Sequence, residues 1–285
     1  MNEDQIVARA RQQVAARQRE ASEQRWGSPW RWLLPALILA VLIAFIAAPA
    51  PLPRKLLLAM GGVCGLRPAH SYFVGGVQLP LEARMIGIYG GFLLAFVVLL
   101  AFRRLGARRL GSPLVIGILV VFFMSMAFDG VNSTLTELGL AHLYMPTNLL
   151  RLLTGLLSGI AIAPFLLWLL NVVATPREPG VSQAVVRVPW ELVAPLAINA
   201  IFAALVLDGH AVFYYPIALA SVVGIVGVLA ITALLVILAI SGLAGRITQV
   251  RQLVAPGALA LLVAFAILGA TATARWTFIT RLASQ

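Results

Sequence analysis

Apolar runs of membrane-spanning length, uninterrupted by any charged residue, recur along this chain of 285 residues. One lies between Arg31 and Arg54, and the next between Arg84 and Arg103. A helix needs about 20 apolar residues to cross the hydrocarbon core of a bilayer. Only 11% of the residues are charged, whereas soluble domains carry about 25%. These features argue against a soluble helical bundle and predict an integral membrane protein.

The pattern of charges and helix-start signals predicts an all-α integral membrane protein of about seven transmembrane helices. Ser112-Pro113 is one such start signal, because a serine side chain can cap the helix and proline fits its first turn. The long run over residues 209–245 is taken as one tilted or kinked helix, with two short helices as the alternative. The expected spans lie within residues 31–54, 84–103, 113–129, 151–175, 191–208, 214–245 and 254–273.

Two regions follow from this division of the chain. Residues 28–285 are expected to form a single polytopic membrane domain. Residues 1–27, rich in Arg, Gln, Glu and Ala, are expected to form a cytoplasmic basic tail. That tail is either an amphipathic helix at the lipid headgroups or a disordered segment.

The distribution of basic residues predicts the orientation. In the seven-span arrangement the 21 Lys and Arg residues divide 14 to 7 between the two faces. The face with more basic residues is normally cytoplasmic, so we expect the N-terminus inside. The net charge of +11 is thus explained by topology and by contact with anionic lipids, and we expect membrane lipids but no nucleic acid as partners.

Residues 64–92 form the segment with the most polar chemistry between apolar runs. They contain the only cysteine, a histidine, two arginines, a glutamate and six glycines. The preceding residues 55–63 are apolar but too few to cross a bilayer. We therefore expect a re-entrant or interfacial segment between the first and second spans. Because irregular backbone at membrane depth must be covered by protein, spans two, three and four are expected to surround it.

Glycines spaced four residues apart predict a contact between two spans. Gly87 and Gly91 begin the second span, and Gly155 and Gly159 lie in the fourth. Small residues one helical turn apart allow close approach of helix backbones in lipid. We expect spans two and four to pack there. Glycine-rich faces could also bind a protein partner or a second copy of the chain.

Charged and hydrogen-bonding residues near the outer boundary form the candidate binding site. Asp129 ends the third span and Arg151 begins the fourth, so a salt bridge between them would tie these spans together. The alternatives are a polar pathway or a ligand clamp, and two charges that both lie in headgroup water. Arginines hold anions such as a lipid phosphate or a carboxylate. The candidate substrate-binding residues are Arg67, Arg84, Tyr89, Asp129, Asn132, Arg151 and Thr154.

Cys64, His70 and Glu82 are candidate metal ligands in the same segment. Their spacing matches no zinc or haem pattern. The chain also has no phosphate-binding glycine loop, serine nucleophile elbow or zincin helix. We therefore expect no cofactor and assign no catalytic residue, and the sequence leaves open whether the protein is an enzyme.

Two blocks of residues carry a resemblance to a known family. The first runs from Cys64 through Arg67-Pro68, Gly75-Gly76 and Ala83-Arg84 to the run Gly87-Ile88-Tyr89-Gly90-Gly91-Phe92. The second comprises Asp129-Gly130, Leu150-Arg151, Thr154-Gly155 and Gly159. Over roughly residues 60–170 the chain resembles DUF2085, bacterial and archaeal membrane proteins of unknown function. This resemblance implies a multi-pass protein of the prokaryotic cytoplasmic membrane, with no established activity.

The chain departs from the family pattern at the cysteine positions. The resemblance implies Cys-His where this chain has Cys64-Gly65, and two cysteines where it has Glu82 and Met85. A metal or thiol site implied for the family would therefore lack most of its ligands here. Three functions remain open: transporter-like binding of an anionic solute or lipid headgroup, an accessory subunit of a larger complex, and a membrane enzyme or redox protein with a degenerate outer-face site.

Overall fold

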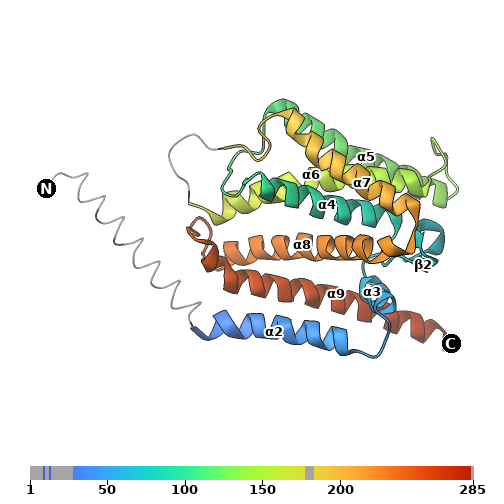
Figure 1. The fold of residues 1–285 in the computed structure, drawn as a ribbon, viewed down its shortest axis with the longest axis horizontal. Coiled ribbons are helices and arrows are strands. Elements are labelled where there is room, and N and C mark those ends of the chain that lie inside the picture. The colour runs from blue at the N-terminus through green and yellow to red at the C-terminus, as the bar shows by residue number, and fades with distance from the viewer. Residues whose placement is uncertain (1–8, 10–12, 14–27, 177–182, 284–285) are drawn as a thin grey trace.

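The structure, a computed structural model, describes residues 9, 13, 28–176 and 183–283. Within the described residues the regular secondary structure is helical, apart from a short hairpin at one end and an isolated bridge between Arg109 and Ala184 (Figure 1). The predicted tail over residues 1–27 lies outside the described residues, apart from Arg9 and Gln13. The helices are α2 (Ser28–Ala47), α3 (Leu52–Met60), α4 (Ala83–Ala101), α5 (Pro113–Glu137), α6 (Asn148–Ala174), α7 (Val193–Asp208), α8 (Tyr214–Ile240) and α9 (Val254–Ala283).

Six of the described helices are long and apolar enough to cross a membrane, which confirms an all-α multi-pass architecture. α2 contributes a shorter apolar stretch, Trp32–Ala47, and its role as a seventh span stays a prediction. α8 runs without a break, so one helix rather than two follows residue 213. The spans comprise Ala83–Ala101, Pro113–Glu137, Asn148–Ala174, Pro189–Asp208, Ala211–Ile240 and Val250–Leu282.

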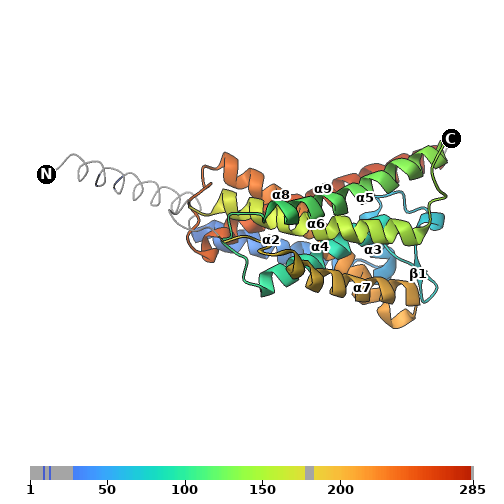
Figure 2. The same ribbon diagram turned by 90° about the horizontal axis from the view of Figure 1, so that it is seen from above.

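The long helices run alternately in opposite directions, and α4 lies at the centre (Figure 1). α6 packs on one side of α4 and α8 on the other, while α9 packs on α8 and α2 on α9. α5 packs mainly on α6, at the edge of the bundle (Figures 1 and 2). The predicted orientation stays a prediction. Following it, we call the end at which α4 begins and α5 ends the outer end, and the opposite end the inner end.

α4 and α6 approach each other at glycines. A Cβ atom added to Gly155 would lie 2.5 Å from the carbonyl oxygen of Arg84, and one on Gly159 would lie 2.4 Å from that of Ile88. On the facing helix, a Cβ on Gly87 would lie 2.4 Å from the carbonyl oxygen of Leu152. Only glycine permits backbones this close. The predicted contact between the second and fourth spans is therefore confirmed.

Polar groups buried at the inner end fasten the loop between α4 and α5. Asn171 of α6 donates hydrogen bonds to the carbonyl oxygens of Arg104 and Ala107 and accepts one from the backbone of Gly106. The guanidinium of Arg104 forms a buried ion pair with Glu191. The three bonds to Asn171 satisfy backbone groups of the loop where it turns, and the ion pair links the loop to the segment before α7.

The glycine contact gives a stability prediction. Gly155→Ala should lower the free energy of unfolding by about 2 kcal/mol, because the added methyl group forces two backbones apart. The matched control is Gly117→Ala on α5, where nothing lies within 4 Å of the new Cβ. It should change stability by less than about 1 kcal/mol. Unfolding in mixed micelles measures both values, and equal effects would contradict the close-packing argument.

Candidate functional site

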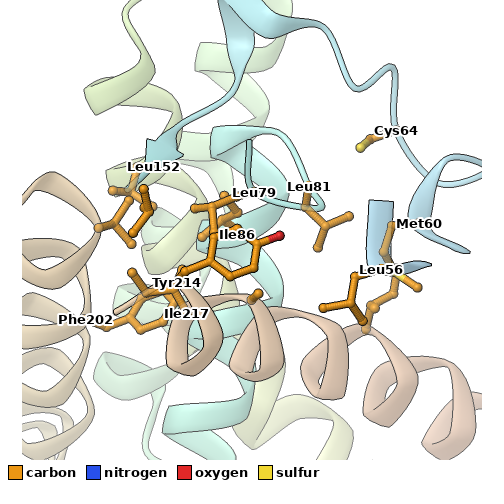
Figure 3. Close-up of a cluster of buried hydrophobic side chains, with 14 of the residues drawn as sticks. Leu56, Met60, Cys64, Leu79, Leu81, Ile86, Leu152, Phe202, Tyr214 and Ile217 are labelled. Carbon is orange, nitrogen blue, oxygen red and sulfur yellow. The ribbon is translucent and has the colours of Figure 1, made fainter. Parts of the chain in front are cut away.

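Residues 61–82 form a structured cap on the outer end of the bundle. A 3-10 turn, η1 (Pro68–His70), leads into an antiparallel hairpin of β1 (Phe73–Val74) and β2 (Val77–Gln78). Gly75 and Gly76 make the two-residue turn, and both have positive φ, as the tight hairpin turn requires. The side chains of Leu79 and Leu81 are fully buried in the apolar cluster between α4, α7 and α8 (Figure 3).

More helices hold this cap than the sequence predicted. α4, α5 and α6 contact it as expected, the last through Asn148, which donates to the carbonyl oxygen of Ala69 at 3.1 Å. In addition, Arg275 of α9 donates to three carbonyl oxygens, those of Gly61, Cys64 and Gly65. The backbone N–H of Gly75 also bonds to Gly209, which follows α7. The cap therefore links α4, α5 and α6 to α9 and to the end of α7.

Asp129 pairs with Arg84, so the predicted salt bridge between Asp129 and Arg151 is wrong. Arg84 Nη2 lies 2.6 Å from Asp129 Oδ2 and also donates to Ser133. The reason is the glycine contact, which sets the start of α4 against Gly155 of α6 and brings the Arg84 guanidinium beside Gly130 of α5. The buried carboxylate of Asp129 thus ties α5 to α4.

Tyr144, which the sequence analysis missed, completes this network from the loop between α5 and α6. Its hydroxyl donates to Asp129 Oδ1 at 2.9 Å. Asn132 holds the loop in place, because its amide donates to the carbonyl oxygen of Tyr144 and accepts from the backbone of Leu143. Burial, followed by the hydrogen bond to Asp129, raises the pKa of Tyr144 to about 12. No motif in the sequence singled out this tyrosine.

A second charged cluster lies at the surface of the cap. Arg67 Nη1 lies 2.8 Å from Glu137 at the end of α5, and the backbone N–H of Arg67 donates to Glu82. His70 Nε2 lies 3.7 Å from Glu137. Burial, together with the positive charges of Arg151 and Arg67, lowers the pKa of His70. His70 is therefore neutral at physiological pH.

Arg151 differs from the other two candidate arginines. Its residue surface is 8% exposed, and Nη1 donates to the neutral side chain of Asn148 at 3.1 Å. Among the described residues, no carboxylate lies within ion-pair distance of it, whereas Arg67 has two such partners and Arg84 has one. Asp129 and Glu137 act on it only at longer range.

Two predicted site residues lie apart from this network. The hydroxyl of Thr154 donates to the carbonyl oxygen of Leu150 in its own helix. Tyr89 lies more than a turn further along α4 than Arg84 and packs against the apolar cluster. Neither joins the network of Arg84, Asp129, Asn132 and Tyr144, and the binding role of both stays a prediction.

The candidate metal ligands do not assemble into a metal site. Cys64 interacts with Glu82. The next residue, Gly65, is also close to this carboxylate, because a Cβ on Gly65 would lie 2.8 Å from Glu82 Oε1. However, no group of three or more His, Cys, Asp or Glu side chains within the described ranges could hold a metal ion. Burial raises the pKa of the Cys64 thiol, which keeps it protonated and weakly nucleophilic.

The part of the chain that resembles a known protein family is the part that builds the outer end. Residues 64–165 match the DUF2085 family of predicted membrane proteins. This match confirms the resemblance seen in the sequence. No curated protein and no solved structure matches the chain. The matched region contains most of the cap, all of α4 and α5 and most of α6, and thus every residue of the Arg84–Asp129–Tyr144 network.

The network gives a second stability prediction. Asp129→Asn should lower the free energy of unfolding by about 3 kcal/mol, because it leaves the Arg84 guanidinium opposite a neutral amide in a nearly dry site. Replacing both residues together, with Arg84→Met and Asp129→Leu, should recover much of this loss. As a control, Arg67→Gln removes a solvent-exposed guanidinium from Glu137 and Glu82 and should cost less than about 1 kcal/mol. Equal losses in Asp129→Asn and Arg67→Gln would contradict the assignment.

Tyr144 gives a pH-dependent prediction. Its pKa in the folded protein, about 12, exceeds the ordinary tyrosine value of about 10, so folding favours the protonated phenol. The stabilisation should be complete below about pH 10 and be lost as the pH rises through the folded value. Absorbance of tyrosinate, compared between the wild type and Tyr144→Phe, isolates this phenol. If the phenol that is lost in Tyr144→Phe titrates in the wild type with the ordinary tyrosine pKa, the hydrogen bond to Asp129 is wrong.

Proposed function

We propose that the outer end of this membrane protein binds the anionic group of a small solute or a lipid headgroup, with Arg151 as the contacting cation. A phosphate or a carboxylate has the matching chemistry, because a guanidinium presents parallel N–H donors to either group. The activity would be transporter-like binding from the outer face rather than catalysis.

The observation that carries this proposal is the pairing of the three arginines. The cluster holds three arginines and three carboxylates, so its net charge gives no reason to bind an anion. All three carboxylates nevertheless form ion pairs with other arginines: Glu82 and Glu137 with Arg67, and Asp129 with Arg84. Arg151 is left buried with one hydrogen bond to a neutral amide. A buried guanidinium without a counter-charge is costly, and a bound anion would remove that cost.

The remaining polar residues would position Arg151 rather than contact the ligand. Asn148 binds both Arg151 and the backbone of the cap, and therefore couples the arginine to residues 69–71. Asp129 is less suited to carrying a proton, because both of its oxygens already accept hydrogen bonds. We therefore assign Asp129 a positioning role.

An accessory-subunit function is the second candidate, and one observation favours it. A groove of about 260 Å³ lies between α5 and α6, and its lining is almost entirely apolar. A partner helix or a lipid chain would fit such a surface. The third alternative, a metal or thiol enzyme, has less support because Cys64 is buried and its neighbours include too few metal ligands.

Binding of simple anions tests the proposal. Purified protein in uncharged detergent should be stabilised against heat by inorganic phosphate, by glycerol 3-phosphate or by short-chain phosphatidylglycerol. Arg151→Gln should weaken this binding about 10- to 100-fold, since a charge-assisted hydrogen bond contributes about 1.5–3 kcal/mol. Stabilisation by the lipid alone would identify a headgroup site, and stabilisation by the free anions would identify a solute site.

The matched control is Arg54→Gln, which removes an exposed arginine from the same end of the bundle. It should leave anion binding unchanged. If no anion stabilises the wild-type protein, or if both variants lose binding equally, the proposal is wrong.

A further inference from the structure

The loop between α5 and α6 exposes an unusual number of large apolar side chains for a segment outside the helices. Leu143 is 78% exposed and Met145 is 69% exposed. Leu138 and Leu140 are also more than half exposed. Residues 138–150 include no Lys, Arg, Asp or Glu. Such a surface is poorly suited to water.

This loop folds back along α5 instead of projecting away from it. Asn132 of α5 bonds to the backbone of both Leu143 and Tyr144, and the Tyr144 hydroxyl reaches Asp129. At 1.5 Å per residue, Asp129 and Asn132 lie about 24 and 28 Å along the helix from Pro113. The hydrocarbon core is about 30 Å thick. With Pro113 at the inner boundary of the core, Leu143 lies at the level where the hydrocarbon core ends.

The exposed side chains of the loop continue the lipid-facing surface of α5. Phe128 and Val131 are both more than half exposed on this helix. The rings of Phe128 and Tyr144 are in contact, with centroids 6.4 Å apart. The loop thus packs beside the face of α5 that meets the acyl chains, at the edge of the bundle (Figure 2).

We propose that this loop is a membrane-interface anchor, whose apolar side chains, led by Leu143 and Met145, insert into the outer-end leaflet. The bilayer would then hold the loop against α5 and keep Tyr144 on Asp129. The partner is the acyl-chain boundary itself. Because the loop has no charged residue, its insertion is independent of anionic lipid.

Site-directed spin labelling tests the proposal directly, since Cys64 is the only native cysteine. Leu143→Cys and Met145→Cys are made in a Cys64→Ser background, labelled with a nitroxide and reconstituted in phosphatidylcholine vesicles with and without phosphatidylglycerol. Collision with oxygen, which partitions into lipid, is compared with collision with a water-soluble nickel chelate. If Cys64→Ser does not fold, the native background serves, because this thiol is buried and its pKa is raised.

Two control positions define the extremes. Val121→Cys, on the lipid-facing side of α5, reports acyl-chain surroundings, and Ala69→Cys, exposed on the cap, reports water. Labels at 143 and 145 should resemble the former, with high oxygen and low nickel accessibility in both lipid mixtures. Accessibility like that at Ala69 would overturn the proposal. So would shielding from both reagents, which would show that a protein partner or a second copy covers the loop.

Discussion

The close approach of α4 and α6 is the contact on which the outer end depends. Glycines on both helices bring carbonyl oxygens and α-carbons into direct contact, with no room for a side chain. In lipid, where water gives no drive for apolar association, such packing is a main source of helix affinity. It also fixes Arg84 between α5 and α6, and so decides which arginine reaches Asp129.

Two kinds of charge pairing follow at the outer end. Arg84 and Asp129 form a pair that is buried and also bonded to Ser133 and Tyr144. Arg67 and Glu137 form a pair open to solvent. The buried pair contributes to helix arrangement because either partner alone would be costly, whereas the exposed pair contributes little. Arg151 has no carboxylate within ion-pair distance among the described residues, and it is the cation that we propose to contact a ligand.

The site was only partly predictable because charge near a helix end does not specify a partner. Asp129 and Arg151 both lie near the outer boundary in the sequence pattern, and pairing them was reasonable. Which guanidinium reaches the carboxylate depends on helix rotation and crossing, and these depend on the glycine contact between α4 and α6. The role of Tyr144 could not be predicted from the sequence for a similar reason. A tyrosine in this loop reaches Asp129 only because Asn132 holds the loop against α5.

The amino-acid sequence was sufficient to predict the membrane class, the position of the long helices, the family resemblance and the glycine contact. Each of these rests on local composition or on spacing along one helix, which the bilayer turns directly into structure. Three further features emerge from the folded arrangement of the helices: Arg84 pairs with Asp129, α9 holds the cap, and Arg151 lacks a carboxylate partner among the described residues. These depend on how helices distant in the chain rotate and cross, and no local pattern encodes that.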